Sequence, residues 1–266
     1  MIGVRSVTII FQKMAESSHI NISEGLRARF ARARRVLVLT GAGISAESGV
    51  PTFRGGGGTA VWKGMPFDVI SSASMLERDL PAVWEWFDYR RGLLAQLSPN
   101  PAHAALVRWQ DQFENFTLVT QNVDGLHQSA GSRGVIELHG NIWRARCRDC
   151  GARYDERPAN DDDAQSVSRT AERICPDCGG LMRPDVVLFG EMLPTGAYEL
   201  AATRARECEL CFVVGTSALV YPAAYLPEIA RAEGAYVVEV NPELTPLSDI
   251  CDEVLNGKAG EVLPLF

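Results

Sequence analysis

Two pairs of cysteines have the spacing of a metal site. Cys147 and Cys150 form one Cys-x-x-Cys pair, Cys175 and Cys178 form another, and each pair is followed directly by glycine. Four thiolates can surround Zn²⁺ tetrahedrally and leave no coordination position open for a reaction. The sequence therefore predicts one structural zinc per chain, which holds together a segment with little hydrophobic core of its own. Two disulfides or four unrelated thiols are the alternatives.

A glycine turn follows a predicted buried strand near the start of the chain. The apolar run at residues 36–39 predicts the strand, and Gly41-x-Gly43-x-x-Ala46 then fits the loose dinucleotide fingerprint G-x-G-x-x-G/A. Glycines let the backbone approach a pyrophosphate closely, and the free N–H groups of a helix start bind it. The spacing alone leaves open a turn without a nucleotide, because many tight strand–helix turns need glycine.

Polar residues follow the ends of several other predicted strands. They are Gln121, Asn122, Asp124, His139, Gly215, Thr216, Ser217 and Asn241. Because ligands bind at the carboxyl ends of parallel strands, we expect these residues to face the glycine turn. Asn122 and Asp124 can hydrogen-bond ribose hydroxyls or a carboxamide, and the imidazole of His139 can accept a proton at neutral pH.

Other interpretations of these polar residues remain open. His139 taken alone fits a buried structural histidine equally well, and a structural role is favoured for His103 and His127. A dehydrogenase would show a second strand after the glycine turn, with an acid about 20 residues on. No such acid is apparent, which counts against a hydride-transfer enzyme.

The elements that carry these residues alternate along the chain. Apolar runs predict strands at residues 36–39, 116–120, 135–138, 185–189, 210–214 and 236–240. Helical patterns occupy residues 23–34, much of 66–97, 102–112, 195–206 and 222–231. This alternation predicts an α/β fold with a parallel sheet covered on both faces. The four glycines at 55–58 predict a mobile loop, and we favour a lid over bound ligand rather than a surface tether.

Composition excludes several classes of protein. The 266 residues are 46% hydrophobic and 22% charged, as in globular proteins, and the net charge of −7 argues against a nucleic-acid surface. No apolar run approaches the roughly 20 residues of a membrane helix. The seven cysteines form an odd set without a clear secretion signal, so we expect a reducing, cytoplasmic location. Met14 is an alternative start, with residues 1–13 as an extension.

Taken together, these stretches resemble the sirtuin family of NAD-dependent protein-lysine deacylases. The matching segments are residues 41–54, 120–127, 138–141, 184–191, 215–217 and 240–241, together with the four paired cysteines. The resemblance runs from about residue 24 to the end of the chain, and the combination of motifs is highly specific.

The resemblance implies a Rossmann-like, doubly wound parallel sheet with a smaller domain made of a zinc-binding module and a helical module. We expect an N-terminal extension at 1–22, sheet-domain segments at 23–56, 98–140 and 183–266, a lid and helical module at 57–97, and a zinc module at 141–182. NAD and acyl-lysine would enter the cleft between the domains from opposite sides.

The resemblance also implies a reaction that consumes NAD as a co-substrate. The acyl oxygen would attack C1′ of the nicotinamide ribose and release nicotinamide. His139, acting with Asn122, would be the general base on the ribose hydroxyl, which then attacks the imidate carbon. Water would yield free lysine and O-acyl-ADP-ribose. The implied NAD contacts are Gly41, Ala42, Gly43, Ser45, Phe53, Arg54, Gln121, Asn122, Asp124, Gly215, Thr216, Ser217 and Asn241.

The implied substrate site has two parts. Val187, Leu188, Phe189, Gly190 and Glu191 would pair with the substrate backbone as an added strand. The resemblance is to bacterial class III sirtuins, which with their mitochondrial relatives bind the carboxylate of succinyl-, malonyl- or glutaryl-lysine through Tyr-x-x-Arg on the helix after the lid. This chain has Phe87 and Arg90 at those two positions. Arg90 could pair with an acyl carboxylate, or it could be a solvated helix arginine. Since Phe87 lacks the hydroxyl, we expect chiefly deacetylation and weakened desuccinylation.

Two functions are alternatives to the deacylase. The same fold supports protein mono-ADP-ribosylation, and a zinc ribbon can be a binding module without enzyme activity. The joint presence of His139, Asn122 and Asp124 argues against the binding module. We expect the partners to be acyl-lysine proteins or peptides, with no nucleic acid and no membrane, and the protein to be a monomer.

Overall fold

The computed structural model describes residues 20–51, 61–157 and 173–266. The expectations for Phe53, Arg54, the glycines at 55–58 and the segment 1–19 lie outside the described residues.

Within these ranges, six parallel strands form one sheet in the order β11-β10-β9-β1-β4-β5. They are β1 (Arg35–Thr40), β4 (Asn115–Thr120), β5 (Ile136–Glu137), β9 (Leu210–Val214), β10 (Tyr236–Asn241) and β11 (Glu253–Asn256). The chain adds β4 and β5 on one side of β1, and then β9 to β11 on the other. The order therefore reverses between β1 and β9, and ligands of open parallel sheets bind at such a switch point.

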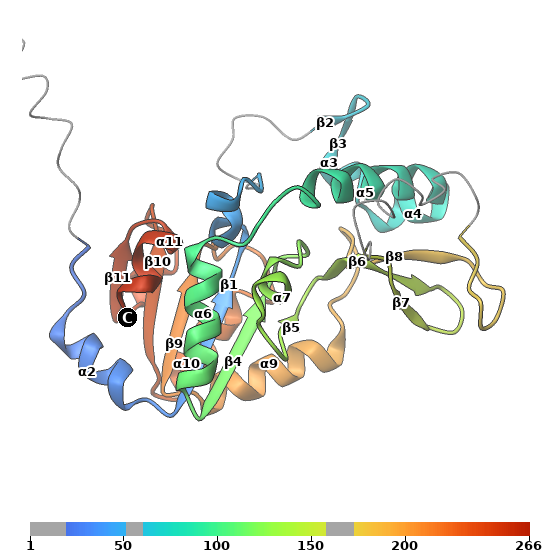
Figure 1. Cartoon of the computed structure of the whole chain (residues 1–266). Helices are drawn as coiled ribbons and strands as arrows, with labels where there is room; N and C mark the ends of the chain where they lie inside the picture. Colours follow the sequence, from blue (N-terminus) through green and yellow to red (C-terminus); the bar gives the residue numbers. More distant parts are fainter. Residues whose placement is uncertain (1–19, 52–60, 158–172) are drawn as a thin grey trace, which may run out of the picture.

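Helices cover both faces of this sheet, as the α/β pattern predicts (Figure 1). On one face lie α2 (Glu24–Arg32), α6 (Pro101–Gln112) and α11 (Ala259–Val262), which bury Phe30, Trp109 and Val262. On the other face lie α9 (Thr195–Glu207) and α10 (Tyr225–Ala232), which pack small residues such as Ala205 and Ala230 against the strands. Burial on both faces explains why the strands appear in the sequence as continuous apolar runs.

A smaller part of the molecule lies to one side of the sheet (Figure 1). Its helices are α3 (Phe67–Ile70), α4 (Ala73–Arg78) and α5 (Leu80–Leu94), and β2 (Val61–Trp62) pairs with β3 (Met65–Pro66). In the described part of the chain, β6 (Gly140–Cys147), β7 (Arg153–Asp155) and β8 (Met182–Val186) form a three-stranded antiparallel sheet. Trp84 of α5 donates a hydrogen bond to the carbonyl of Met182 at 3.0 Å, which joins the helices to this sheet.

Two strand predictions were wrong in extent or in role. The strand expected at 185–189 lies at Met182–Val186, and it pairs antiparallel with β6 rather than joining the parallel sheet. It ends early because the side chain of Glu191 accepts a hydrogen bond from the backbone of Leu188 at 2.8 Å and closes a turn. The strand expected at 135–138 is only Ile136–Glu137. The domain boundary expected after residue 182 falls inside β8.

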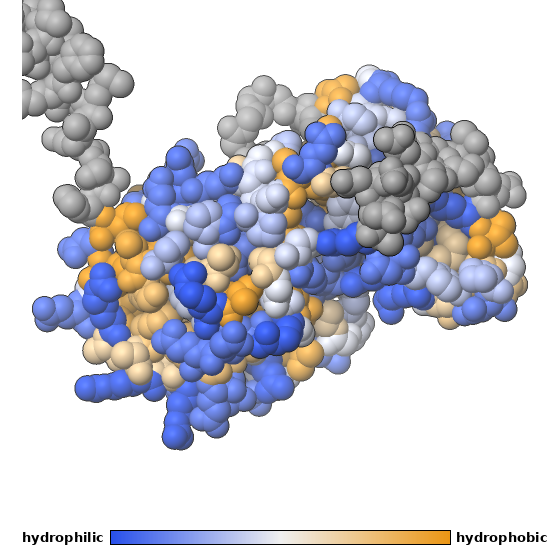
Figure 2. Space-filling model, in the orientation of Figure 1, coloured by the Kyte–Doolittle hydropathy of each residue, from blue (hydrophilic) through white to orange (hydrophobic). Residues whose placement is uncertain are grey.

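The surface carries mostly polar residues on the face shown in Figure 2, with hydrophobic residues in separate smaller areas. Among the helices of the described residues, none combines the length and the apolar character that spanning a membrane needs.

Candidate active site

Two glycine turns interlock at the switch point between β1 and β9. The N–H of Gly41 donates to the carbonyl of Val214 at 3.0 Å, and the N–H of Gly43 donates to the carbonyl of Gly215 at 2.7 Å. A Cβ on Gly43 would lie 2.6 Å from the Cα of Gly215. Gly215 has a φ of 61°, and a Cβ there would lie 2.4 Å from the backbone nitrogen of Ile44. These glycines are therefore needed for contact between the two turns, apart from any contact with a ligand.

Ser45 is the centre of a polar cluster behind the first turn. It lies on the 3₁₀ helix η1 (Ala42–Ser48), and its hydroxyl donates to Asp124 Oδ2 at 2.8 Å. The Nδ2 of Asn122 donates both to Ser45 Oγ, at 3.2 Å, and to the carbonyl of Gly41, at 3.0 Å. These bonds fix the orientation of the Asn122 amide. Within the described residues, its Oδ1 has no hydrogen-bond partner and can accept one from a ligand.

A second polar group joins the ends of β4, β9 and β10, across the end of β1 between them. Gln121 follows β4 and donates through Nε2 to the hydroxyl of Thr216, which follows β9, at 3.0 Å. Asn241, the last residue of β10, donates through Nδ2 to the carbonyl of Thr216 at 3.3 Å. Ala42 and Ser217 are half-buried in the two glycine turns. The structure thus brings the described members of the predicted NAD set to one edge of the sheet.

The imidazole of His139 is held in one tautomer. Its Nδ1 lies 2.7 Å from the backbone carbonyl oxygen of Gln121. Because a carbonyl oxygen can only accept, Nδ1 carries the proton and Nε2 keeps its lone pair in the neutral ring. Burial lowers the pKa of His139 below 6.5, and the hydrogen bond from Nδ1 to Gln121 opposes that shift. The ring is therefore neutral at neutral pH, with Nε2 available as a base.

His103 and His127 have the structural role that was favoured for them. His103 accepts a hydrogen bond from the backbone of Asn100 at 3.2 Å and completes the capping box at the start of α6. The Nε2 of His127 lies 3.0 Å from the hydroxyl of Thr40 at the end of β1. Burial lowers the pKa of His103 to about 4 and that of His127 to about 3, so both rings are neutral. The ring of His103 also reaches Ser45, at 3.5 Å.

Asp124 and Arg90 influence each other across the site. Burial raises the pKa of Asp124, and hydrogen bonds from Leu126 and Ser45 and the charge of Arg90 oppose that shift. Burial also lowers the pKa of Arg90, which the charge of Asp124 opposes. Arg90 is half-buried, with its guanidinium carbon 5.4 Å from the centre of the Trp86 ring, so it is not a fully solvated helix arginine.

The other residues of the predicted acyl site lie on the same helix. Phe87 is buried in the cluster formed by α3, α4, α5, β6 and β8. Tyr89, between Phe87 and Arg90 on this helix, is 51% exposed.

The segment from Val187 to Glu191 lies beside His139 and is held from several sides. The N–H of Val187 donates to the carbonyl of His139 at 2.9 Å. The N–H of Phe189 donates to the carbonyl of Ser71, before α4, and its carbonyl accepts from the N–H of Ala73, the first residue of α4, each at 2.9 Å. Glu191 forms a two-fold ion pair with the buried Arg183. Phe189 is 52% exposed, whereas Leu188 is buried.

The four predicted zinc ligands converge. The sulfur atoms of Cys147, Cys150, Cys175 and Cys178 all lie within 4.8 Å of one another. Cys147 Sγ is 3.5 Å from Cys178 Sγ, and Cys150 Sγ is 3.7 Å from Cys175 Sγ. Four sulfurs placed tetrahedrally at about 2.3 Å from Zn²⁺ would be roughly 3.8 Å apart. The four thiols therefore fit a structural zinc, and they are free rather than disulfide-bonded.

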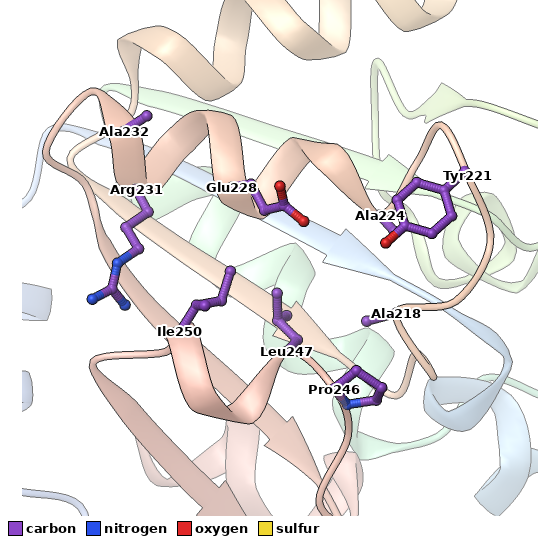
Figure 3. Close-up of a pocket in the computed structure, with 9 residues that line it drawn as sticks. All are labelled: Ala218, Tyr221, Ala224, Glu228, Arg231, Ala232, Pro246, Leu247 and Ile250. Atoms are coloured by element: carbon purple, nitrogen blue, oxygen red, sulfur yellow. The ribbon is translucent and has the colours of Figure 1, made fainter.

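A cavity of about 550 Å³ lies next to the second glycine turn, because Ala218, which directly follows Ser217, lines it (Figure 3). It lies between α10 and the segment that includes η2 (Ser248–Ile250), and its wall includes Ala218, Glu228 and Leu247. Among the described residues predicted to contact NAD, none lines this cavity. The polar cluster, rather than this cavity, therefore remains the candidate site.

Two threonines that were not predicted as site residues support the site. Thr40 and Thr120 end adjacent strands, and their hydroxyls are hydrogen-bonded to each other at 2.9 Å. Thr120 Oγ1 also accepts from the N–H of Asn122 at 3.0 Å, and so positions that residue. The sequence shows a threonine at the end of each of these two apolar strands, and this pattern could have identified both residues.

Comparison with known proteins agrees with this geometry. The sequence profile of the Sir2 family matches residues 41–222. The NAD-dependent protein deacylase of Aquifex aeolicus (strain VF5) is 48% identical over 225 residues, which make up 84% of this chain and 90% of that protein.

Solved structures are similar over nearly the whole length. A Sir2 homologue in complex with NAD has a TM-score of 0.82 at 38% identity, and the match covers 92% of each chain. A triple mutant of a Sir2 homologue in complex with 2′-O-acetyl ADP ribose has a TM-score of 0.80 at 39% identity, covering 91% of this chain and 94% of that one. Since the profile spans more than half of the sequence and these relatives span most of it, this chain belongs to the Sir2 family.

Proposed function

We propose that this protein is an NAD-dependent protein-lysine deacylase that acts chiefly on acetyl-lysine. It consumes NAD and releases nicotinamide, free lysine and O-acyl-ADP-ribose. The observation that carries this proposal is the hydrogen bond from His139 Nδ1 to the Gln121 carbonyl, because it leaves Nε2 basic beside side chains that can hold a ribose. The Aquifex relative, named for this activity, and the relative bound to acetyl ADP ribose support the reaction and its product.

In this proposal, His139 takes a proton from a ribose hydroxyl through Nε2. A general base must be unprotonated at the working pH, and burial lowers the pKa of His139 and so favours the neutral ring. Asn122 assists through Oδ1, since both of the hydrogen bonds described for its amide nitrogen go to Gly41 and Ser45.

The NAD contacts proposed here follow the polar edge of the sheet. They are Gly41, Ala42, Gly43, Ser45, Gln121, Asn122, Asp124, Gly215, Thr216, Ser217 and Asn241, together with Phe53 and Arg54, which lie outside the described residues. The interlocked turns and the fixed amides of Asn122 and Gln121 support this assignment. Holding these groups in place before binding lowers the entropy cost of ordering them.

The substrate backbone is proposed to pair with the segment from Val187 to Glu191. The carbonyl of Val187 makes no backbone hydrogen bond within the described residues and is open to an added strand. Because this contact uses main-chain groups, selectivity for the peptide sequence should be loose. The bond from Val187 to His139 places the segment next to the proposed base.

Acyl selectivity is proposed to depend on Phe87 and Arg90. Arg90 supplies a cation near Asp124 that could pair with a succinyl carboxylate, but Phe87 supplies no hydroxyl donor. A hydrogen bond to a charged group contributes about 1.5–3 kcal/mol, so its absence weakens succinyl binding about tenfold or more.

The test is turnover of one peptide that carries acetyl-, succinyl- or longer acyl-lysine, with and without NAD. We expect NAD-dependent release of free lysine, with acetyl preferred. The variant Phe87→Tyr should raise kcat/KM for the succinyl peptide about tenfold relative to acetyl, and thermal unfolding checks that the added hydroxyl is tolerated. A wild-type preference for succinyl would contradict this weighting of Phe87. Transfer of ADP-ribose to protein, without free lysine, would favour the mono-ADP-ribosyltransferase.

We further propose that the protein works as a cytoplasmic monomer and that its domains are divided as the sequence predicts, except that the last boundary follows β8 rather than residue 182. The seven free cysteines support a reducing compartment. Size-exclusion chromatography with light scattering tests the monomer, and a stable dimer would overturn it.

A further inference from the structure

Glu239 is a buried acid of the parallel sheet that the proposed reaction does not use. It lies on β10, two residues before Asn241, and only 1% of it is exposed. Because alternate residues of a strand face the same side, Glu239 and Asn241 share one face of the sheet. That face is the one under α9 and α10, since Val213, which pairs with Glu239 on β9, belongs to the hydrophobic cluster there. A carboxylate is costly to bury unless it is paired or hydrogen-bonded, so its partners define its role.

The two carboxylate oxygens of Glu239 hold the segment that follows β10. The hydroxyl of Thr245 donates to Oε1 at 2.5 Å, and the hydroxyl of Ser248 donates to Oε2. Each hydroxyl also accepts a backbone hydrogen bond. Ser248 Oγ accepts from the N–H of Thr245 at 2.9 Å, and Thr245 Oγ1 accepts from the N–H of Leu247 at 3.1 Å. Glu239 therefore ties both ends of one turn of the chain to the sheet.

The held turn shares a hydrophobic cluster with the residue that follows the second glycine turn. Leu247 is 4% exposed and belongs with Ala218 to the cluster under α9 and α10. The same two residues line the cavity beside α10 (Figure 3). Ala218 directly follows Ser217, and its N–H donates to the hydroxyl of Thr216 at 3.3 Å. The held turn thus supports two of the proposed NAD contacts from behind.

Asn241 is the second connection between Glu239 and the site. The hydrogen bond from Thr245 to Glu239 closes a short loop of the chain, and this loop includes Asn241. Asn241 donates through Nδ2 to the carbonyl of Thr216 at 3.3 Å, and its own carbonyl accepts from the N–H of Gly257 at 3.2 Å. Closing the loop leaves Asn241 fewer conformations to lose when a ligand binds.

We propose that Glu239 is a positioning residue for NAD. It holds residues 242–250 so that Asn241 and the second glycine turn are in place before NAD binds, which removes part of the entropy cost of binding. This inference rests on the proposed function, in which those residues contact NAD. His139 and Asn122, which carry the chemistry there, follow β5 and β4 on the other side of β1. Loss of the Glu239 contacts should therefore raise the KM for NAD and leave kcat nearly unchanged.

Kinetics at saturating acetyl-lysine peptide and calorimetric titration with NAD test the proposal. Glu239→Leu is similar in size but removes both acceptors. It should raise the KM and Kd for NAD about tenfold or more, the scale of one lost hydrogen bond to a charged group. Thr245→Val removes one of the two donors and should raise both constants by less. Glu239→Gln should stay near wild type, because its amide can accept from one hydroxyl and donate to the other.

Asp249→Asn is the matched control. Asp249 is an exposed acid in the same segment, so its loss should change neither constant. Wild-type NAD affinity in Glu239→Leu would overturn the proposal. A fall in kcat at unchanged KM would also overturn it, since that result indicates less folded enzyme rather than poorer positioning.

A combined variant tests whether Glu239 acts through the two hydroxyls. Glu239→Leu with Thr245→Val and Ser248→Ala should lose no more NAD affinity than Glu239→Leu alone, and additive losses would reject the assigned contacts. If Glu239→Leu folds poorly, Thr245→Val still decides, since wild-type affinity there would count against the role of the clamp. If the wild type binds NAD but releases no free lysine, the proposed function fails, and the NAD affinities by themselves still test Glu239.

Discussion

His139 shows how one hydrogen bond sets the chemistry of a side chain. The Gln121 carbonyl holds the proton on Nδ1, and burial holds the pKa below 6.5, so the ring is a neutral base with a known free nitrogen. His103 and His127 are also neutral, but His103 caps a helix and His127 meets a threonine hydroxyl inside the protein. The same residue type thus has different roles because of its hydrogen-bond partners.

The pH dependence of turnover follows from this lowered pKa. A base must be unprotonated, so the acidic limb of kcat/KM should reflect the pKa of His139 and fall below pH 6.5. His139→Ala should reduce turnover by about 10²–10⁴-fold and remove this limb. Initial rates across the acidic range measure both effects. Full activity in His139→Ala would refute the proposed mechanism.

Secondary-structure elements position the two glycine turns and the segment that follows β8. Reversal of strand order between β1 and β9 brings the two turns together, and small residues let their backbones touch. The segment after β8 depends on one buried arginine, since Arg183 binds both Glu191 and the carbonyl of Val186. Each element therefore supports the site through a contact that no single motif contains.

Gly43→Ala should disrupt the contact between the turns. The added methyl would lie 2.6 Å from Gly215 Cα, and overpacking of this kind costs about 1–3 kcal/mol. NAD affinity should fall, as measured by isothermal titration calorimetry. Gly92→Ala on α5 is the matched control, because a Cβ there meets nothing within 4 Å. It should be neutral or slightly stabilising, and equal loss of NAD affinity in both variants would argue against the role of the turn.

Arg183→Ala should destabilise the protein by about 3–5 kcal/mol, because it leaves Glu191 without its partner in a largely buried site. Arg204→Ala provides the comparison. Arg204 also pairs with a glutamate, but both of those side chains are 48% exposed, so the loss should be within about 1 kcal/mol. Urea unfolding measures the difference, and similar losses would show that burial of the Arg183 pair is unimportant.

At the scale of the whole molecule, the site depends on contact between the sheet and the smaller part. One hydrophobic cluster includes Val50 and Leu126 near the glycine turn, together with Trp86 and Val186 from the smaller part. Arg91 of α5 pairs with Asp88 and Glu156, and Arg173 pairs with the same two acids. Because β6 begins after His139 and ends at Cys147, and β8 ends just before Val187, one sheet connects the zinc cluster to the site.

Zinc removal should therefore reduce both stability and turnover. We expect one zinc per chain by elemental analysis, and a strong chelator should lower the melting temperature and abolish deacylation. Restoring zinc should restore both if the chain refolds. Cys175→Ser should reduce zinc content, whereas Cys251→Ser, outside the cluster, should leave it unchanged. Full turnover in the chelated protein would contradict a structural role for the metal.

Local patterns determined most of the elements. The strands at Arg35–Thr40, Asn115–Thr120 and Leu210–Val214 were predicted within one residue, because strands buried in a parallel sheet are rich in apolar residues. The cysteine pairs were also readable, since metal ligands require fixed residue types at fixed spacing. The strand at Met182–Val186 was misplaced, because an apolar run does not reveal which strand it pairs with.

The glycine turn that suggested a dinucleotide site was identified from sequence alone, and so were the polar residues that end the strands. The contacts and hydrogen bonds among these residues were decided by the tertiary structure. Only the fold shows that Gly43 touches Gly215, that Ser45 joins Asn122 to Asp124, and that His139 keeps its proton on Nδ1. The reason is physical: residue types and spacing determine local conformation, whereas tautomer, pKa and close backbone contact depend on neighbours that are distant in the chain.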